Sequence, residues 1–376
     1  MMELVLYLSM FGTLCWWSLI LFPWRPWSTR EKIETGVAGY ADVLLNDITV
    51  LIPARNEGLY IRRTLSGVKV QGEGIRIIVI DDQSVDDTAE EAKRCGAQVI
   101  PGTSPPVGWS GKLWALEQGL QEVRTPYTLL LDADIALAPG IIAELRRKAK
   151  DEHLALVSLM AEPPMKNFIE SLLMPAFIFF FKLLYPFGLA NKSGSRVAAA
   201  AGGCILVETQ ALRSVGAFIN LHHALIDDCT LAAHIKCAGL RTWIGLSHAA
   251  CSHRGYQALK PIWEMVARTA YTQLRYSLSL LLICTLIMIA MFWAAPLGFL
   301  LLSTPKAYMV SALAWGAMLF TYMPILIYYQ RSPLWGLALP IIGTLYLAMT
   351  WTSALQYWRG ERACWKDRRY ESKTNH

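Results

Sequence analysis

The sequence predicts an α/β domain with a mostly parallel sheet, joined to transmembrane helices at its N-terminal and C-terminal ends. Two observations lead to this prediction. Long uncharged apolar runs lie near both ends of the chain, whereas the middle alternates short apolar runs with charged stretches. Within that middle part, β-branched runs alternate with helix-like stretches, which is the order expected of parallel strands joined by crossover helices.

Four uncharged runs are long enough to cross a bilayer. Each has more than about 20 residues, the helical length that spans the roughly 30 Å of hydrocarbon. Hydrophobic residues make up 54% of the chain and charged residues 17%, as expected if these runs are buried in lipid. The four runs are Leu4–Trp24, Tyr276–Pro305, Ala307–Gln330 and Ser332–Trp358.

We interpret residues 1–24 as an uncleaved N-terminal transmembrane anchor, the alternative being a cleaved signal peptide. Glu3 stands where a signal peptide carries basic residues, and no small-x-small cleavage site follows the run. The run ends at Phe22 to Arg25, an aromatic and basic boundary typical of a helix leaving the bilayer. Residues 276–358 form a C-terminal membrane region by the same length criterion.

Charges beside the membrane runs give conflicting indications. Arg25, Arg30 and Lys32 place the middle domain in the cytoplasm, and the basic tail, residues 359–376, also favours the cytoplasm. Three full spans between the middle domain and the tail would put these two parts on opposite sides of the membrane. Either one run is a re-entrant or interfacial hairpin, or the tail does not follow the rule. The candidate break points are Pro296, Pro324 and Pro340.

A further apolar stretch, residues 168–189, interrupts the middle domain. It contains Glu170, Lys182 and two prolines, and as a span it would divide the domain across the bilayer. We therefore interpret it as an interfacial helix that lies in the plane of the headgroups.

Cysteine spacing and net charge exclude two classes of function. The eight cysteines include no CxxC pair and no Cys/His spacing suited to zinc, so we expect reduced packing thiols. The net charge of +6 lies partly beside the membrane runs, and no basic-aromatic patch is present. These features indicate contact with anionic headgroups of the membrane bilayer and no nucleic-acid partner.

Three predicted strands of the middle domain end in polar or acidic residues. Because ligands bind beyond the carboxyl ends of parallel strands, we expect a nucleotide there. The strands are Ile48–Ile52, Ile75–Ile80 and Thr128–Leu131. The segments that follow them are Pro53–Gly58, Asp81–Ser84 and Asp132–Asp134.

No glycine-rich phosphate loop is present at these strand ends. Pro53–Gly58 has one glycine where a dinucleotide fingerprint needs three, and Gly111-Lys112 lacks the rest of a P-loop. A diphosphate therefore needs another source of positive charge. Asp132 and Asp134, an Asp-x-Asp pair after an apolar strand, can hold Mg²⁺ or Mn²⁺, which bridges phosphates. The alternative is that both are solvated turn residues.

Several motifs taken together resemble glycosyltransferase family 2. The block around Gly108-Trp109 and Gly111-Lys112 is similar to the ceramide glucosyltransferase and carotenoid glycosyltransferase branch. Other segments resemble the hopene-associated glycosyltransferase group, so the resemblance covers nearly the whole chain. The family motifs are Pro53–Glu57, Asp81–Ser84, Pro106–Ala115, Asp132–Asp134 and Asp227-Asp228. The segments of the hopene-associated group are Ser171–Phe177, Leu184–Phe187, Tyr346–Thr350 and Trp358–Gly360.

This resemblance implies a GT-A catalytic domain over residues 46–275 and a metal-dependent, inverting hexosyl transfer. The donor would be a nucleotide sugar, a UDP-sugar above all, and the acceptor a membrane lipid such as a hopanoid. Asp228 would be the general base, and Asp132 and Asp134 would hold Mg²⁺ or Mn²⁺. A surface lysine is the alternative for Lys112. The residues implied in donor binding are Ala54, Arg55, Asn56, Glu57, Asp81, Asp82, Lys112 and Asp132.

One segment departs from the family pattern. Many relatives carry a Gln/Arg-x-x-Arg-Trp element before the membrane region, whereas this chain has Arg268, Gln273 and Arg275 without the Arg-Trp pair. The departure argues against a processive polysaccharide synthase. These three residues, with Gly203 and Asp227, are implied on the acceptor side, although Asp227 is alternatively a helix cap.

These inferences lead to a multi-pass protein of the bacterial inner (cytoplasmic) membrane, with its catalytic domain facing the cytoplasm. A polyprenyl-phosphate or other glycolipid glycosyltransferase stays open as an alternative. So does a non-catalytic membrane scaffold built on a degenerate transferase domain, whose mark would be the loss of an acidic strand end. No such loss occurs in this sequence.

Overall fold

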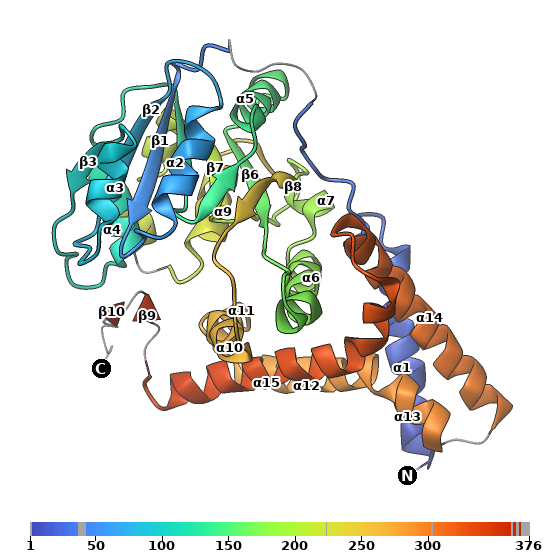
Figure 1. The fold of residues 1–376 in the computed structure, drawn as a ribbon. Helices are drawn as coiled ribbons and strands as arrows, with labels where there is room; N and C mark the ends of the chain where they lie inside the picture. Colours follow the sequence, from blue (N-terminus) through green and yellow to red (C-terminus); the bar gives the residue numbers. More distant parts are fainter. Residues whose placement is uncertain are drawn as a thin grey trace. The chain divides into compact units, whose positions relative to one another are not determined.

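The computed structural model describes residues 2–36, 43–222, 224–301, 304–361, 364–365 and 368–369 (Figure 1). Most of the predicted basic tail, residues 359–376, lies outside them. The chain forms two compact units. We call Met1–Arg30, Met165–Gly188 and Tyr256–Glu361 the helical unit, and Glu31–Pro164 with Leu189–Gly255 the sheet unit.

The sheet unit is built on eight strands in the order β3-β2-β1-β4-β7-β6-β8-β5. The strands from β3 to β4 are mutually parallel, as predicted. The rest of the sheet is mixed, because β7 runs antiparallel to β4 and β6, and β5 runs antiparallel to β8. The bounds are β1 Ile48–Ala54, β2 Arg76–Asp81, β3 Gln98–Pro101, β4 Tyr127–Leu131, β5 Ile135–Leu137, β6 Leu156–Glu162, β7 Cys204–Glu208 and β8 Thr242–Ser252.

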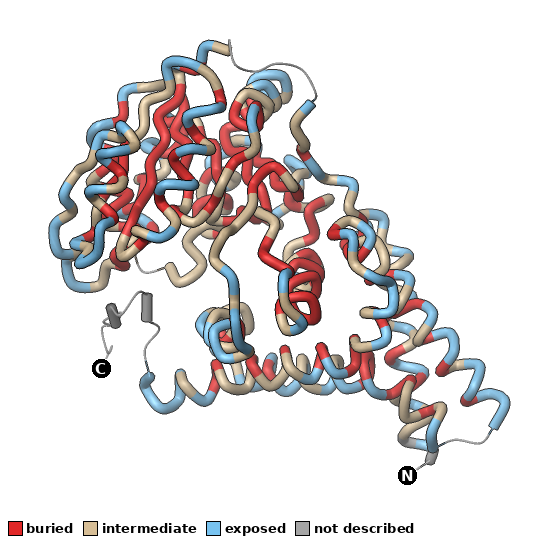
Figure 2. The backbone as a smooth tube through the Cα atoms, viewed as in Figure 1, coloured by how far each residue is buried: buried red, intermediate tan, exposed pale blue. Residues whose placement is uncertain are grey.

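Helices cover both faces of this sheet, because every residue of β1 is buried and its side chains alternate between the faces. Val50 and Ile52 pack in a core with helices α2 and α5, whereas Leu51 packs on the opposite side with α4, α8 and α9. Figure 2 shows the strands buried along their length and the outer helix faces exposed. The helices are α2 Ile61–Lys69, α3 Thr88–Arg94, α4 Gly111–Leu120, α5 Ile141–Asp151, α8 Thr209–Ser214, η1 Ile219–Leu221 and α9 Asp227–Cys237.

One edge of the sheet collects the chain segments that carry the predicted site. The carboxyl ends of β1, β2 and β4 meet there because these strands are parallel. The antiparallel strand β7 begins at the same edge, with Cys204 opposite Leu131. β8 ends there as well, since Ser252 pairs with Ile135 directly after the Asp132–Asp134 turn. We call this the carboxyl edge.

The helical unit contains the predicted membrane runs. Helices α1, α13 and α14 pack together, and α15 packs along α10, α11 and α12 (Figure 1). The helices are α1 Met2–Leu21, α6 Phe168–Leu184, α10 Leu259–Ala267, α11 Ala270–Gln273, α12 Leu278–Phe292, α13 Ala294–Leu301, α14 Pro305–Tyr328, η2 Pro333–Ala338 and α15 Leu339–Trp358. A short helix, α7 (Phe187–Ala190), follows α6.

Among the described residues, two helical segments are long and apolar enough to cross a membrane. They are Pro305–Tyr328, of 24 residues, and Pro333–Trp358, of 26 residues. The segments Leu259–Gln273 and Leu278–Phe292 would add a third only if they formed one span, and they are bent by 118° at their junction. The apolar part of α1, Val5–Leu21, is shorter, so the N-terminal anchor stays a prediction.

The predicted run Tyr276–Pro305 is not one continuous helix. It divides into α12 and α13 at Trp293. Pro296 explains the break, since it has no N–H for a bond to the carbonyl of Phe292 and its ring clashes with that carbonyl. The other two candidate breaks were wrong, because Pro324 lies inside the continuous helix α14 and Pro340 in the first turn of α15.

The charged residues of the stretch predicted as interfacial, residues 168–189, are buried. Glu170 completes a capping box with Asn167 at the start of α6 and is 1% exposed. Lys182 is 2% exposed, donates to the carbonyl oxygen of Ser28 and lies over the ring of Phe187. Both charges therefore have partners within the helical unit, and the helix ends earlier than predicted, at Leu184.

Apolar side chains cover the surface of the helical unit. Most of the exposed large apolar residues among the described part of the chain belong to this unit. On α12 they include Leu278, Leu282, Leu286 and Ile289, each at least 40% exposed. A surface of this kind is unfavourable in water, so together with the two long apolar helices it indicates membrane association.

Close helix crossings in the helical unit depend on glycine. A Cβ atom added to Gly12 of α1 would lie 2.1 Å from the carbonyl oxygen of Ala290 in α12, and one added to Gly298 would lie 2.2 Å from Ser311 Oγ. Small residues let helix backbones approach in this way in membranes. At Gly316 of α14, in contrast, an added Cβ would meet no atom within 4 Å.

We expect Gly12→Ala to destabilise the helical unit by about 1–3 kcal/mol, because the new methyl group overpacks the crossing. The control Gly316→Ala places the same methyl group in open space and is expected to be neutral or slightly stabilising. Thermal unfolding of the two variants in the same detergent measures the difference. Equal midpoints for both would contradict the α1–α12 packing.

Candidate active site at the carboxyl edge

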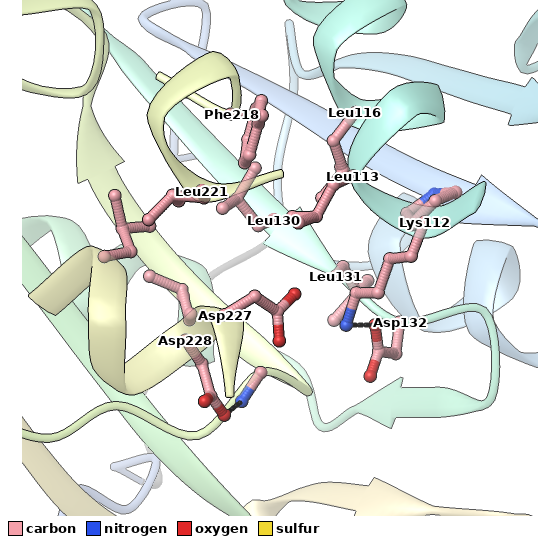
Figure 3. A pocket seen from close by; sticks show the side chains of 14 residues that line it. Lys112, Leu113, Leu116, Leu130, Leu131, Asp132, Phe218, Leu221, Asp227 and Asp228 are labelled. Atoms are coloured by element: carbon pink, nitrogen blue, oxygen red, sulfur yellow. Dashed lines mark hydrogen bonds and ion pairs between the residues drawn. The ribbon is translucent and has the colours of Figure 1, made fainter. Parts of the chain in front are cut away.

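A small cavity of about 20 Å³ opens at the carboxyl edge (Figure 3). Three carboxylates and one ammonium group line it on one side, and apolar side chains line it on the other. These groups come from β4, α4, the start of β7, η1 and α9, which are far apart in the sequence. The lining residues are Pro53, Lys112, Leu113, Leu116, Leu130, Leu131, Asp132, Gly202, Ile205, Phe218, Leu221, Asp227, Asp228 and Leu231.

Lys112 is the cation of this cavity. Ser110 caps helix α4 by accepting from the N–H of Leu113, which fixes Lys112 in the first turn. Its Nζ lies 2.6 Å from Asp132 Oδ1. Burial alone would lower the pKa of Lys112, but Asp132, Asp227 and nearby Asp228 raise it above the ordinary value. Lys112 is therefore a fixed positive charge in the site and not a surface lysine.

The carboxylate of Asp132 faces Lys112, as Figure 3 shows. Its backbone N–H donates to the carbonyl oxygen of Gly203, so the turn after β4 is anchored to the segment before β7. Burial raises the pKa of Asp132, and the neighbouring Asp134 and Asp227 add to this, while Lys112 opposes it. Burial is thus the main reason that the pKa of Asp132 lies above its ordinary value.

Asp227 and Asp228 open helix α9, so both carboxylates lie at the positive end of the helix dipole. Asp228 Oδ2 accepts from the N–H of Gly202 at 2.8 Å, and its Oδ1 accepts from the N–H of Cys229 at 2.7 Å. Burial and the charge of Asp227 nevertheless raise the pKa of Asp228 to about 7. It is Asp228, and not Asp227, that bonds the first turn of the helix.

Gly202 must be small for these groups to meet. A Cβ atom added there would lie 3.3 Å from Asp228 Oδ2 and 3.4 Å from Lys112 Nζ. The glycine therefore lets the backbone approach both charged groups and donate its N–H to Asp228. The neighbouring Gly203, predicted on the acceptor side, contributes its carbonyl oxygen to Asp132.

Asp134 lies on the same turn as Asp132 but contacts a different cation. Its Oδ2 lies 3.1 Å from Arg254 Nε, and a terminal nitrogen of the same guanidinium bonds Glu57 Oε2. The Arg254 guanidinium lies 4.7 Å above the ring of Tyr60. Glu57, predicted in donor binding, is thus an ion-pair partner whose side chain is 7% exposed.

The loops after β1 and β2 form the part of the carboxyl edge predicted to hold a nucleoside. Arg55 donates to the carbonyl oxygen of Asp82 at 2.6 Å, and the Asp82 N–H donates to the carbonyl oxygen of Ala54. Asn56 adopts a positive φ of 53°, which turns the loop. Asp81 Oδ1 is buried without a hydrogen-bond partner among the described residues, and it is therefore able to accept a hydrogen bond from a ligand.

Three of the acceptor-side residues belong to the helical unit. Arg268 caps the C-terminus of α10, and Gln273 Oε1 accepts from the hydroxyl of Tyr185 at 2.6 Å. Arg275 follows α11 with a positive φ of 51°. Their assignment to the acceptor stays a prediction.

The donor chemistry of the Asp132–Asp134 turn fits a hard divalent cation. In nucleotide sites such ions bind through one or two carboxylates together with substrate phosphates. Asp132 and Asp134 supply two carboxylates, and both already contact a cation, Lys112 or Arg254. No group of three potential His, Cys, Asp or Glu ligands occurs among the described residues, so the donor phosphates would have to complete the coordination.

Residues 49–216 match the sequence model of Glycosyl transferase family 2. This segment, which is less than half of the chain, is similar to glycosyltransferase family 2. The matched segment contains β1, β2, β4 and the Asp132–Asp134 turn, and therefore most of the carboxyl edge.

Proteins similar to part of this chain include 4,4'-diaponeurosporenoate glycosyltransferases. The protein from Staphylococcus haemolyticus (strain JCSC1435) is 33% identical over 116 residues, covering 30% of this chain and 31% of that protein. The one from Staphylococcus aureus (strain USA300) is 36% identical over 89 residues, covering 23% of this chain and 24% of that protein. The chain thus spans less than a third of the length of these curated relatives.

A solved structure shows the same fold. It is a mannosyltransferase from Pyrobaculum calidifontis in complex with GDP-mannose and Mn²⁺, with a TM-score of 0.57 and 16% identity. The match covers 95% of this chain and all of that chain. The chain therefore has the GT-A fold that the sequence predicted.

Arg254 and Tyr60 were missed by the sequence analysis. Arg254 follows directly on β8 and so reaches the carboxyl edge, but the length and direction of β8 become visible only in the sheet. A basic residue directly after the last strand of the domain was the one available signal. Tyr60, at the start of α2, had no distinguishing pattern.

The raised pKa of Asp228 predicts a stability difference that depends on pH. The unfolded carboxyl titrates near 4 and the folded one at about 7, so the native protein loses stability as pH rises between these values. Asp228→Asn removes the titrating carboxyl group and therefore this loss of stability at higher pH. We expect its stability relative to the wild type to increase by about 1–3 kcal/mol between pH 4.5 and pH 8.

Thermal unfolding of both proteins across this pH range measures the change. Asp87→Asn removes an exposed carboxylate at the start of α3 and serves as the control for a general charge effect. A stability difference between Asp228→Asn and wild type that does not vary with pH would contradict the environment described for Asp228.

Proposed function

We propose that this chain is a membrane-bound, inverting glycosyltransferase that transfers a sugar from a nucleotide sugar to a membrane lipid. The observation that carries the proposal is the cavity in which Lys112, Asp132, Asp227 and Asp228 converge at the carboxyl edge of a domain similar to family 2. The apolar helical unit supports a membrane location. The Pyrobaculum structure, with GDP-mannose and Mn²⁺, supports a nucleotide-sugar donor.

In this proposal Asp228 is the general base for the acceptor hydroxyl. Two backbone N–H groups hold its carboxylate in one orientation, so both oxygens are fixed at the cavity. A base works best when its pKa lies near the working pH, and the pKa of Asp228 is raised to about 7. The deprotonated hydroxyl attacks the anomeric carbon in a single displacement, which inverts its configuration.

Lys112 and the Asp132–Asp134 turn serve the leaving group. Lys112 keeps its charge because three carboxylates surround it, so it supplies a fixed positive charge at the end of β4. Asp132 and Asp134 would hold Mg²⁺ or Mn²⁺, which offsets negative charge on the nucleotide diphosphate as a Lewis acid. Arg55, Asn56, Asp81 and Asp82 would bind the nucleoside, as proposed for a UDP-sugar.

The acceptor is proposed from the helical unit and from the relatives. The Staphylococcus proteins are named for transfer to diaponeurosporenoate, a carotenoid acid, and the apolar helices support a location beside lipid. We infer a lipid alcohol, with hopanoid polyols as the specific candidate and polyprenyl phosphates as the alternative. A catalytic domain facing the cytoplasm, at the bacterial inner membrane, would give access to nucleotide sugars.

We expect Asp228→Asn to lower the rate of sugar transfer by about 10²–10⁴-fold, the usual contribution of a general base. Binding of the nucleotide should change little, because the loops after β1 and β2 are untouched. Transfer from a radiolabelled nucleotide sugar to membrane lipids, together with calorimetric nucleotide affinity, measures both quantities. Asp227→Asn is the matched variant, and a larger loss there than in Asp228→Asn would assign the base to Asp227.

Lipid extracts test the acceptor directly. Cells that express the wild-type protein should contain a lipid heavier by one hexose than its precursor, and cells that express Asp228→Asn should accumulate the precursor. Mass spectrometry of the two extracts identifies both partners of the reaction. Identical extracts from cells with and without the wild-type protein would count against a lipid acceptor.

A further inference from the structure

Arg254 has no role in the reaction proposed above. It follows β8 at the carboxyl edge, and its guanidinium connects two loops. On one side it lies 3.1 Å from Asp134 Oδ2, and on the other it bonds Glu57 Oε2. Its face lies 4.7 Å from the centre of the Tyr60 ring, which restricts its orientation. Arg254 is therefore held where Asp134 would contact a metal ion.

The charges at this edge are unbalanced. Five carboxylates line or adjoin the cavity, whereas their ion pairs among the described residues involve two cations, Lys112 and Arg254. Arg254 is monovalent and shared between two carboxylates. A divalent cation carries twice the charge of Arg254 and would interact more strongly with Asp134. It would therefore compete with Arg254 for the carboxylate oxygens of Asp134. The five carboxylates are Glu57, Asp132, Asp134, Asp227 and Asp228.

We propose that Arg254 holds Asp134 while the donor is absent, releases it to the divalent cation, and then binds the nucleotide diphosphate. The proposal rests on the function proposed above, in which Asp134 contributes to a metal site. It adds a residue that positions the donor and explains how the free site avoids uncompensated negative charge.

The contacts of Arg254 allow this change of partner. Glu57 keeps hold of the guanidinium when Asp134 is released, and Glu57 is itself fixed by the bond from its N–H to Thr88 Oγ1 at 2.7 Å. The released nitrogen, Nε, then faces the metal-bound part of the donor. A guanidinium suits this role because it has several N–H donors, so one nitrogen can stay on Glu57 while Nε donates to a phosphate oxygen.

Two binding measurements on the full chain in lipid nanodiscs test the proposal. Free Mn²⁺ is followed by its electron paramagnetic resonance signal in the absence of nucleotide. Arg254→Met should bind Mn²⁺ roughly three- to tenfold more tightly than wild type, because the competing cation is gone. With Mn²⁺ saturating, the same variant should bind UDP roughly tenfold more weakly by calorimetry, and GDP replaces UDP if wild type does not bind UDP.

Two further variants make the result specific. Arg62→Met removes an exposed arginine from α2 and should change neither affinity. Arg254→Lys retains the charge but lacks the separate planar donors that reach Glu57 and a phosphate together, so its Mn²⁺ affinity should stay close to that of wild type while its UDP affinity falls.

The outcomes separate this proposal from the one on which it rests. Equal Mn²⁺ affinities of wild type and Arg254→Met, including no binding by either, overturn the exchange at Asp134. Unchanged UDP affinity in Arg254→Met overturns the diphosphate contact. If Asp134→Asn leaves Mn²⁺ binding intact, the metal assignment itself fails. If Asp134→Asn abolishes it while Arg254→Met has no effect, only the role of Arg254 is wrong.

Discussion

Repulsion among carboxylates at one edge of the sheet is the constraint on which the site depends. Burial raises the pKa of Asp132 and of Asp228, repulsion from neighbouring carboxylates adds to this, and Lys112 is the shared cation that opposes it. Like charges that are partly withdrawn from water destabilise the fold unless other groups compensate. The site thus stores unfavourable charge interactions, which is common where a protein prepares to bind a cation or transfer a proton.

The mixed sheet explains how these groups meet. Parallel strands alone would bring together the ends of β1, β2 and β4, whereas the antiparallel strand β7 adds its beginning to the same edge. Gly202 lies just before β7. Its backbone can approach Lys112 and Asp228 only because it has no side chain. Helix α9 then presents its N-terminus with the two adjacent aspartates. The chemistry therefore depends on a change of strand direction in the middle of the sheet.

The sequence was most informative where local patterns determine structure. Strand β4 and the acidic turn after it were predicted because an apolar run followed by Asp132 and Asp134 is a local signal. The pair Asp227-Asp228 was predicted through family resemblance, and the structure places it at the cavity. The confirmed fold class follows from the same alternation of strands and helices.

Features that depend on distant contacts were not predictable in the same way. The ion pair between Arg254 and Asp134 joins residues that are 120 positions apart, and neither residue carries a pattern that names its partner. The two antiparallel strands, β7 and β5, were missed because strand direction is set by tertiary pairing. The sequence indicated a break at Pro296, in the correct run. The helix is interrupted earlier, at Trp293, because a proline disrupts the turn that precedes it.

The packing of α1 has a consequence for how the chain is assembled. Helix α1 contacts α12, α13 and α14, which follow it in the sequence and are synthesised after it. All strands of the eight-stranded sheet are synthesised in between. Helix α1 therefore lacks these neighbours while the strands are being synthesised, and it can pack against them only after α14 has been made.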